Sequence, residues 1–222
     1  SYVGLSYSDN DSSIDSSAWG LNGAFAAGPN FQLDAGYASI AGGDANNWNI
    51  GGHFFSRNDS WLWGGFVGYD NISGSGDNVG EWTVAAQTQF YMDRTTLSGN
   101  LSYSQSDDVA PFGQFTTTAI DGEARYFATD NFSIQGSLGY GNLDSDSGGS
   151  GDYWTYGVGA EFKPDSSPVS FYAGWQSFNG DGSDLNAWQV GVRYNWGGTL
   201  LERNRSGASL SEPRGFVASV LL

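Results

Sequence analysis

Residues 188–196 read Trp188-Gln189-Val190-Gly191-Val192-Arg193-Tyr194-Asn195-Trp196, and this stretch decides the fold. Apolar side chains occupy every second position, with aromatic rings at both ends and aliphatic residues between them. The intervening positions hold Gln, Gly, Arg and Asn. This alternation is the period of a β-strand, in which successive side chains point to opposite faces. An apolar face with aromatic rings at both ends is typical of a transmembrane barrel strand, with lipid outside and a wet lumen inside.

The same period recurs along the chain and predicts twelve strands. We expect them near 2–8, 17–27, 31–40, 48–56, 61–71, 81–92, 95–106, 116–128, 132–143, 153–163, 169–179 and 185–196. The connections alternate between short turns, such as 28–30 and 93–94, and mostly longer loops rich in Asp, Gly, Ser and Asn, such as 72–80 and 144–152. Short turns on one side and longer loops on the other predict an up-and-down antiparallel meander.

Aromatic residues gather at both ends of the predicted strands. An aromatic residue precedes each long loop and, in five of six cases, a tryptophan follows it. This belt contains Tyr7, Trp19, Tyr37, Trp48, Tyr69, Trp82, Tyr103, Tyr140, Trp154, Trp175 and Trp188, and a second belt at the short-turn end contains Trp196. Soluble sandwiches, propellers and solenoids are the alternatives. A sandwich would bury its aromatic face centrally, and a solenoid would show a shorter, stricter repeat.

The last predicted strand also resembles the assembly signal of bacterial outer-membrane barrels, a polar residue, then glycine, then two aromatic residues at alternate positions. Gln189, Gly191, Tyr194 and Trp196 match it. With the strand pattern over residues 2–196, the chain resembles Gram-negative outer-membrane β-barrel proteins of the porin-like kind. The resemblance implies an all-β fold, a closed up-and-down antiparallel transmembrane β-barrel of about 12 strands, with short periplasmic turns and longer extracellular loops. It also implies contact with outer-membrane lipid and lipopolysaccharide, and insertion by the barrel-assembly machinery.

Composition agrees with this expectation. The 222 residues suit one domain, and no stretch approaches the roughly 20 apolar residues of a membrane helix. The chain contains no cysteine, and its start at Ser1 passes directly into a strand pattern, as expected of an exported chain after removal of its signal peptide. The formal charge of -16 repels nucleic acid. We expect the barrel to occupy residues 1–197 and a periplasmic C-terminal tail to occupy 198–222.

Charges facing the expected lumen are few. They are Asp34, Asp121, Glu123, Arg125, Glu161 and Arg193, whereas Asp residues crowd the predicted long loops. Bulky inward residues (Phe55, Phe66, Tyr91 and Tyr172) are expected to narrow the lumen. An acidic mouth would concentrate cations, although acidic loops also serve solubility alone.

Two other kinds of site deserve comparison with simpler explanations. Asp144, Asp146, Asp181 and Asp184 offer oxygen ligands that suit calcium, but no stretch matches an EF-hand loop, and solvated loops explain the same residues. No other cofactor is indicated. His53, the only histidine, lies near the short-turn end, away from the loop mouth where barrel proteases of the omptin kind carry their histidine. We therefore expect a polar residue facing the lumen and no enzyme.

The tail after Trp196 is unusual, because many outer-membrane barrels end at the closing aromatic residue. It carries Arg203, Arg205 and Arg214 and ends in the apolar run 215–222. A loose extension, a plug inside the lumen and a segment that docks onto a protein partner all remain open. The leading expectation is an outer-membrane channel for ions or small hydrophilic solutes with a cation bias. The alternative is a structural or interaction barrel with a closed lumen, whose loops or tail bind a partner.

Overall fold

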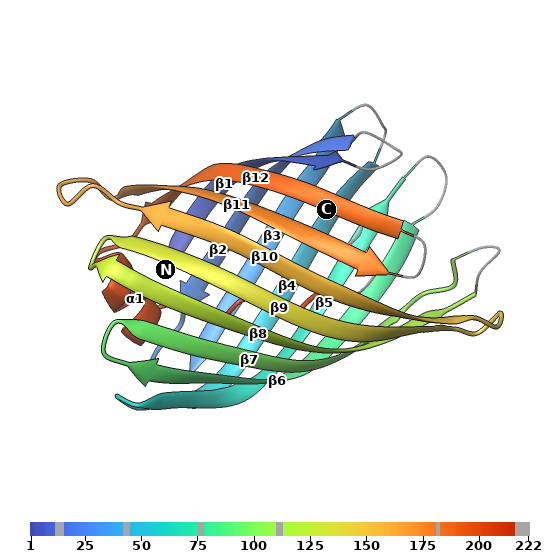
Figure 1. Ribbon diagram of the computed structural model, residues 1–222, viewed down its shortest axis with the longest axis horizontal. Coiled ribbons are helices and arrows are strands. Elements are labelled where there is room, and N and C mark those ends of the chain that lie inside the picture. Colours follow the sequence, from blue (N-terminus) through green and yellow to red (C-terminus); the bar gives the residue numbers. More distant parts are fainter. Residues whose placement is uncertain (12–15, 42–44, 75–77, 110–112, 181–182, 216–222) are drawn as a thin grey trace.

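The computed structural model describes residues 1–11, 16–41, 45–74, 78–109, 113–180 and 183–215. It is a closed barrel of twelve antiparallel strands with one short helix (Figure 1). The elements are β1 (Tyr2–Asp11), β2 (Ser16–Ala26), β3 (Phe31–Ala41), β4 (Ala45–Arg57), β5 (Trp61–Ser73), β6 (Asn78–Met92), β7 (Thr95–Ser106), β8 (Phe115–Thr129), β9 (Phe132–Ser145), β10 (Ser150–Phe162), β11 (Val169–Gly180), β12 (Ser183–Asn195) and α1 (Leu200–Ser206). The predicted fold class and all twelve predicted strands are confirmed.

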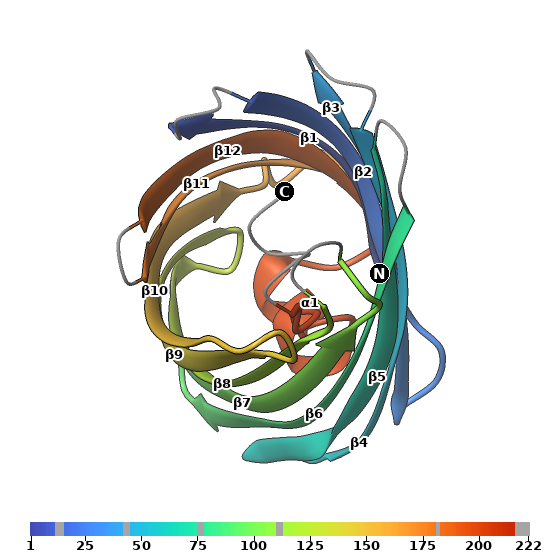
Figure 2. The same cartoon turned by 90° about the vertical axis from the view of Figure 1, so that its right-hand side faces the viewer.

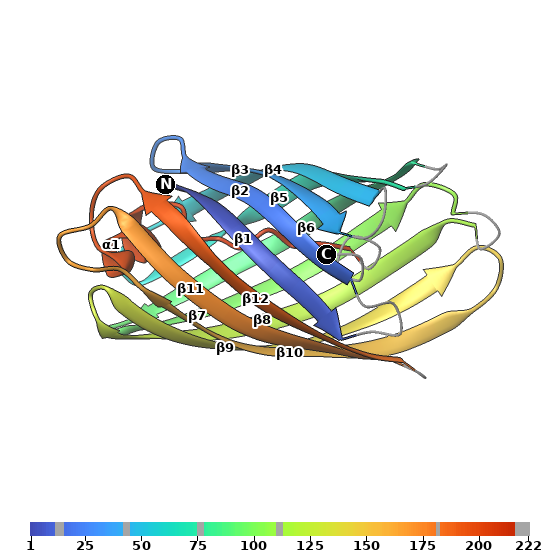
Figure 3. The same cartoon turned by 90° about the horizontal axis from the view of Figure 1, so that it is seen from above.

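Each strand pairs with its neighbours in sequence, and β1 pairs with β12 to close the barrel. In that closing pair Tyr2 lies opposite Asn195 and Asp11 lies opposite Asn186. Several strands are longer than predicted at the long-loop end; β10, for example, begins at Ser150 and not near 153. Backbone pairing continues there although the side chains no longer alternate between apolar and polar. The strands are strongly tilted relative to the long axis of the barrel (Figure 3), as closure of a sheet requires.

The two faces of the sheet have opposite chemistry. The large exposed hydrophobic side chains include Trp188, Val190, Val192 and Tyr194 on β12, which is the face predicted to contact lipid. Buried residues are mostly polar, among them Gln32, Asn49 and Gln89. Among the described residues, no helix has the length and apolar character needed to cross a membrane.

The chain turns back into the barrel after β12. Helix α1 lies at the short-turn end, within the barrel opening, and the chain then runs on through the interior (Figure 2). We call residues 199–215 the inner segment. It divides the interior into a packed side and an open side, and this division positions the candidate site.

Candidate functional site

Helix α1 is anchored across the short-turn opening. Its first turn closes a capping box, in which the Glu202 amide donates to Thr199 Oγ1 (3.1 Å) and the Thr199 amide donates to Glu202 Oε2 (2.8 Å). The Leu201 amide donates to the Asp130 carbonyl in the β8–β9 turn (3.0 Å). At the neighbouring β6–β7 turn, Arg205 donates to the Thr95 carbonyl of β7 (3.1 Å). The helix is therefore tied to two separate parts of the rim.

A buried charge cluster fixes the same helix to the wall. Arg203 Nη1 and Nη2 donate to Glu161 Oε1 and Oε2 at 2.9 and 2.6 Å, and Arg193 Nη1 donates to Glu161 Oε2 at 2.8 Å. Ser170 Oγ donates to Glu161 Oε1 (2.6 Å), and the Arg193 guanidinium lies 3.9 Å from the centroid of the Tyr172 ring. Glu161, predicted to face the lumen, thus holds both Arg193 of β12 and Arg203 of α1, and neither Glu161 nor the predicted lumen residue Arg193 stands free in water.

Beyond α1, side-chain amides of the wall bind the backbone of the inner segment. Gln32 Oε1 accepts from the amides of Ser209 (3.0 Å) and Leu210 (3.2 Å), and its Nε2 donates to the Leu210 carbonyl (2.8 Å). Gln89 donates to the Ser209 carbonyl (3.2 Å) and Gln87 to the Ser211 carbonyl (3.0 Å). These glutamines come from β3 and β6, and they give the segment the partners that a neighbouring strand would supply.

An apolar pocket receives one side chain of the inner segment. Phe55, Leu62, Tyr91 and Leu210 form a buried hydrophobic cluster. Phe55 and Tyr91 were predicted to narrow the lumen, and they do so as a binding pocket for Leu210. Nearby, Arg57 donates to the Gly207 carbonyl (3.0 Å).

His53 lies in a buried polar row on the same wall. Its Nε2 is 2.6 Å from Asp34 Oδ2, its Nδ1 is 2.6 Å from Gln87 Oε1, and its ring packs against Phe66 at 4.7 Å between centroids. His53 has 0% exposure. None of these contacts joins His53 to a hydroxyl group, so this row lacks the nucleophile that a hydrolytic triad needs.

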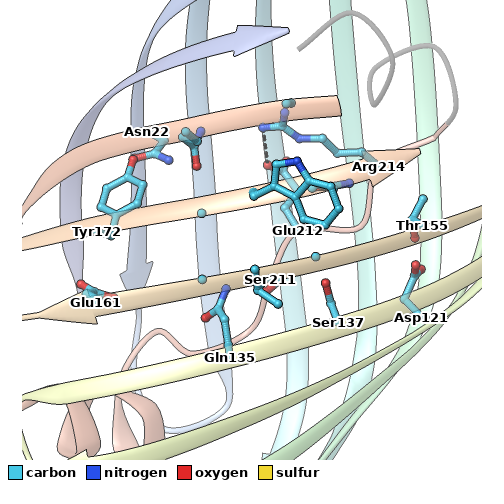
Figure 4. Close-up of a pocket in the computed structure, with 18 of the residues that line it drawn as sticks. Asn22, Asp121, Gln135, Ser137, Thr155, Glu161, Tyr172, Ser211, Glu212 and Arg214 are labelled. Atoms are coloured by element: carbon cyan, nitrogen blue, oxygen red, sulfur yellow. Dashed lines mark ion pairs between the residues drawn. The ribbon is translucent and has the colours of Figure 1, made fainter. Parts of the chain in front are cut away.

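The opposite side of the lumen is open. A cavity of about 570 Å³ lies beside the inner segment, and its lining extends from Asn10 and Asn186 near the loop end to Asn204 in α1. Its wall is built from β8–β12 and the first strands, mainly from small or polar residues such as Gln135, Ser137 and Thr155, with Glu212 and Arg214 facing it from the inner segment (Figure 4).

Equal numbers of acidic and basic side chains line this cavity. Asp34, Asp121, Glu161 and Glu212 face it together with Arg125, Arg193, Arg203 and Arg214. Glu123 and Arg125 form an ion pair of 3.1 Å on β8. Asp121 is the exception, because no ion pair involves it in the described part of the chain. Of the six predicted lumen charges, Asp121 is therefore the one that remains available to a solute.

The predicted calcium ligands that the structure describes lie at the loop end. Asp184 Oδ1 accepts from Asn179, and Asp144 and Asp146 belong to the long β9–β10 hairpin, while Asp181 lies outside the described residues. No group of three or more His, Cys, Asp or Glu residues suited to a metal ion occurs within the described ranges. Calcium binding stays a prediction.

The aromatic residues predicted to form the loop-side belt lie on the outer face. Every tryptophan that follows a long loop stands opposite an aromatic residue in register: Tyr7 with Trp19, Tyr37 with Trp48, Tyr69 with Trp82, Tyr140 with Trp154, and Trp175 with Trp188. Tyr103 lies beside Trp82 with ring centroids 5.5 Å apart, and Trp196 packs against Phe25 at the other end.

Two residues of the assembly-signal pattern face inward and two face outward. Gln189 lines the cavity, whereas Tyr194 and Trp196 are exposed on the outer face. Gly191 has a steric role in addition, because a Cβ there would lie 2.4 Å from the Leu5 carbonyl oxygen and 2.5 Å from the Tyr172 ring. A role for the four residues in assembly stays a prediction.

Sequence reasoning missed the contacts that hold the inner segment. The glutamines at 32, 87 and 89 occupy the inward positions of the strand alternation, but their pairing with residues 209–211 is not visible in local sequence. Leu62 carried the clearest clue, because an inward leucine between two outward tryptophans, Trp61 and Trp63, has no place in a wet lumen unless something apolar covers it.

Similarity to known proteins is found in structure and not in sequence. No protein-family model and no curated protein matches the chain by sequence. The solved structures similar to it include a KdgM porin in complex with disordered oligogalacturonate (TM-score 0.66, 14% identity, 89% of this chain and 100% of that chain) and the NanC porin (TM-score 0.65, 9% identity, 87% and 100%). A loop-deletion mutant of OmpT, an outer membrane protein of Vibrio cholerae, is also similar (TM-score 0.54, 10% identity, 88% and 98%). The chain therefore has the fold of the porin-like outer-membrane β-barrels.

Proposed function

We propose that this protein is an outer-membrane channel that passes small hydrophilic solutes along the open side of its lumen. The observation that carries the proposal is the polar cavity beside the inner segment, whose lining extends from the loop end to α1. A barrel that served only as a scaffold would gain stability by filling this space with side chains. Here the facing strands carry Gly, Ser, Thr and Gln instead.

We further propose a bias toward cations. The cavity lining holds as many basic as acidic residues and supplies no net negative charge, so the bias comes from Asp121 and from the acidic loop end, where Asp9, Asp107, Asp108 and Asp152 stand. Carboxylates at a mouth raise the local concentration of cations and repel anions. The KdgM structure is a complex with oligogalacturonate, a polyanion. The acidic mouth of this chain argues against such a solute here.

We also propose which partners the barrel contacts. The exposed apolar outer face is matched to outer-membrane lipid and, at the loop end, to lipopolysaccharide, and insertion would proceed through the barrel-assembly machinery. The overall charge disfavours nucleic acid as a partner. We propose transport without catalysis, since the contacts of His53 supply no nucleophile.

Planar-bilayer recording of the folded full-length chain tests the proposal. A steady current with a reversal potential that indicates cation preference is expected, and Asp121→Asn should reduce that preference. Absence of current from protein that shows the heat-modifiable gel mobility of a folded barrel would overturn the channel proposal. It would favour the alternative, a structural barrel with a closed lumen whose loops or tail bind a partner.

A further inference from the structure

The carboxyl group of Glu212 is the least satisfied part of the docked inner segment. Its Oε2 accepts a hydrogen bond from Asn49 and lies 3.7 Å from Arg214 Nη2. Its Oε1 is buried and has no hydrogen-bond partner among the described residues. That oxygen would lie 3.2 Å from a Cβ placed on Gly51, so it sits close to the backbone of β4. A buried carboxylate oxygen without a donor favours the neutral form of the acid.

Charged groups from three neighbouring strands and from the inner segment itself surround Glu212. Asp34 on β3 and Asp70 on β5 are acidic, while His53 on β4 and Arg214 within the segment are the basic groups. Burial raises the pKa of Glu212 to about 7; Arg214 and His53 oppose the shift, and Asp70 and Asp34 add to it. Docking of the segment thus brings a third acidic group near Asp34 and Asp70.

On the basis of the proposed channel function, we propose that Glu212 is a proton-operated latch. With its carboxyl group protonated, residues 207–215 stay docked on β3–β6 and the lumen is narrow. With the carboxyl group ionised, this stretch leaves the wall and the lumen widens.

The direction of the pH effect follows from the two states. When the stretch is released, the carboxyl group returns to its ordinary pKa of 4.5, whereas in the docked state its pKa is about 7. The docked state therefore binds the proton more tightly. The contribution of this bound proton to docking is fully present below about pH 4.5 and is lost as the pH rises through 7. The difference corresponds to a weakening of the docking equilibrium on the order of a hundredfold.

The distribution of contacts explains why the stretch can move while α1 stays in place. Helix α1 is held by the ion pairs of Arg203 with Glu161. Residues 207–211 are held by hydrogen bonds from the neutral side-chain amides of glutamines, by a hydrogen bond from Arg57 and by the burial of Leu210. The boundary between the two kinds of anchor is Gly207, the C-cap of α1.

Thiol labelling of the full-length protein in lipid vesicles tests the latch, because the native chain contains no cysteine. Ala208→Cys reports undocking, since Ala208 is 3% exposed in the docked state. Ser137→Cys, on the open wall, corrects for the greater reactivity of thiols at higher pH. The ratio of the two labelling rates should rise at least tenfold between pH 5.5 and 8.5, and Glu212→Gln should keep it low at both pH values. His53→Gln, which removes the one histidine beside Glu212, should retain the rise.

The outcomes separate the latch from the channel. A pH-independent ratio in protein with native Glu212 overturns the latch, as does a rise that survives in Glu212→Gln or disappears in His53→Gln. Steady current with such a pH-independent ratio would leave the channel intact and the latch refuted. Absence of current at every pH would refute the channel, while a rising ratio would still establish pH-dependent undocking.

Discussion

The two sides of the lumen are built from the same kind of strand, yet one is packed and the other is open. On β3–β6, long amides and apolar side chains such as Gln32, Phe55 and Leu62 bind the inner segment. On β8–β12, shorter residues such as Ser137 and Thr155 line the open cavity. The difference teaches that inward residues of a barrel are selected for what stands in front of them, and not for the lumen in general.

The largest effect is expected from Glu161→Ala, which removes the partner of two arginines at the junction of the two sides. Arg193 and Arg203 would be left buried without a counter-charge, because the Glu161 side chain is only 5% exposed and pairs with both. Loss of one partner of a buried pair costs about 3–5 kcal/mol. Denaturant unfolding in detergent micelles should show the loss. Glu123→Ala, in a more exposed pair, is the control; an equal loss in both would contradict the structural role.

Leu210→Ala tests the apolar pocket of the packed side. Removal of a buried leucine side chain costs about 2–4 kcal/mol through lost burial and the cavity left behind. Here the loss falls on docking of the inner segment, so protease cleavage within residues 207–215 should become faster while the barrel stays folded. Unchanged protection would show that the pocket around Leu62 does not hold the segment.

Gln32→Ala should weaken docking less. It removes three hydrogen bonds to residues 209 and 210, two accepted by Oε1 and one donated by Nε2. We expect about 1–3 kcal/mol, because the freed backbone groups regain water only in part. Gln135→Ala on the open wall is the matched control and should leave protease protection unchanged. Equal effects of the two substitutions would contradict the claim that only the packed side holds the inner segment.

Asp121→Asn should have the smallest effect on stability, within about 0.5 kcal/mol, because Asp121 forms no ion pair with any residue that the structure describes. Its effect should appear in ion selectivity, as a reversal potential closer to zero in a salt gradient. Asp144→Asn, on the far hairpin, provides the comparison. A larger shift from Asp144→Asn would place selectivity in the loops and not in the cavity.

The barrel could be predicted from sequence because its decisive interactions are local. Alternation of side chains, as in 188–196, follows from the pleat, and the turn lengths fix which strands are neighbours. The sequence places an aromatic residue before a long loop and a tryptophan after it, and the register pairs these residues, as in Tyr7 with Trp19 and Tyr37 with Trp48.

The inner segment could not be predicted in the same way, because it has no alternation and no strand partner. Its backbone is bound by side chains from β3 and β6, more than 100 residues away in sequence. Nothing in residues 207–215 alone distinguishes a bound segment from a loose one. Only the inward Leu62, Phe55 and Tyr91 indicated that an apolar partner was required.

One measurement tests the open path most directly: single-channel current of two single-cysteine variants before and after a charged thiol reagent is added. Ser137→Cys places the thiol on the open side, and Ser102→Cys places it on β7, between the two sides and outside the cavity lining, where Ser102 is 7% exposed. The same change of serine to cysteine makes the pair closely matched. We predict that the reagent reduces the current of Ser137→Cys and leaves that of Ser102→Cys unchanged. An unaffected Ser137→Cys channel, or equal reduction in both variants, would contradict a path confined to the β8–β12 side.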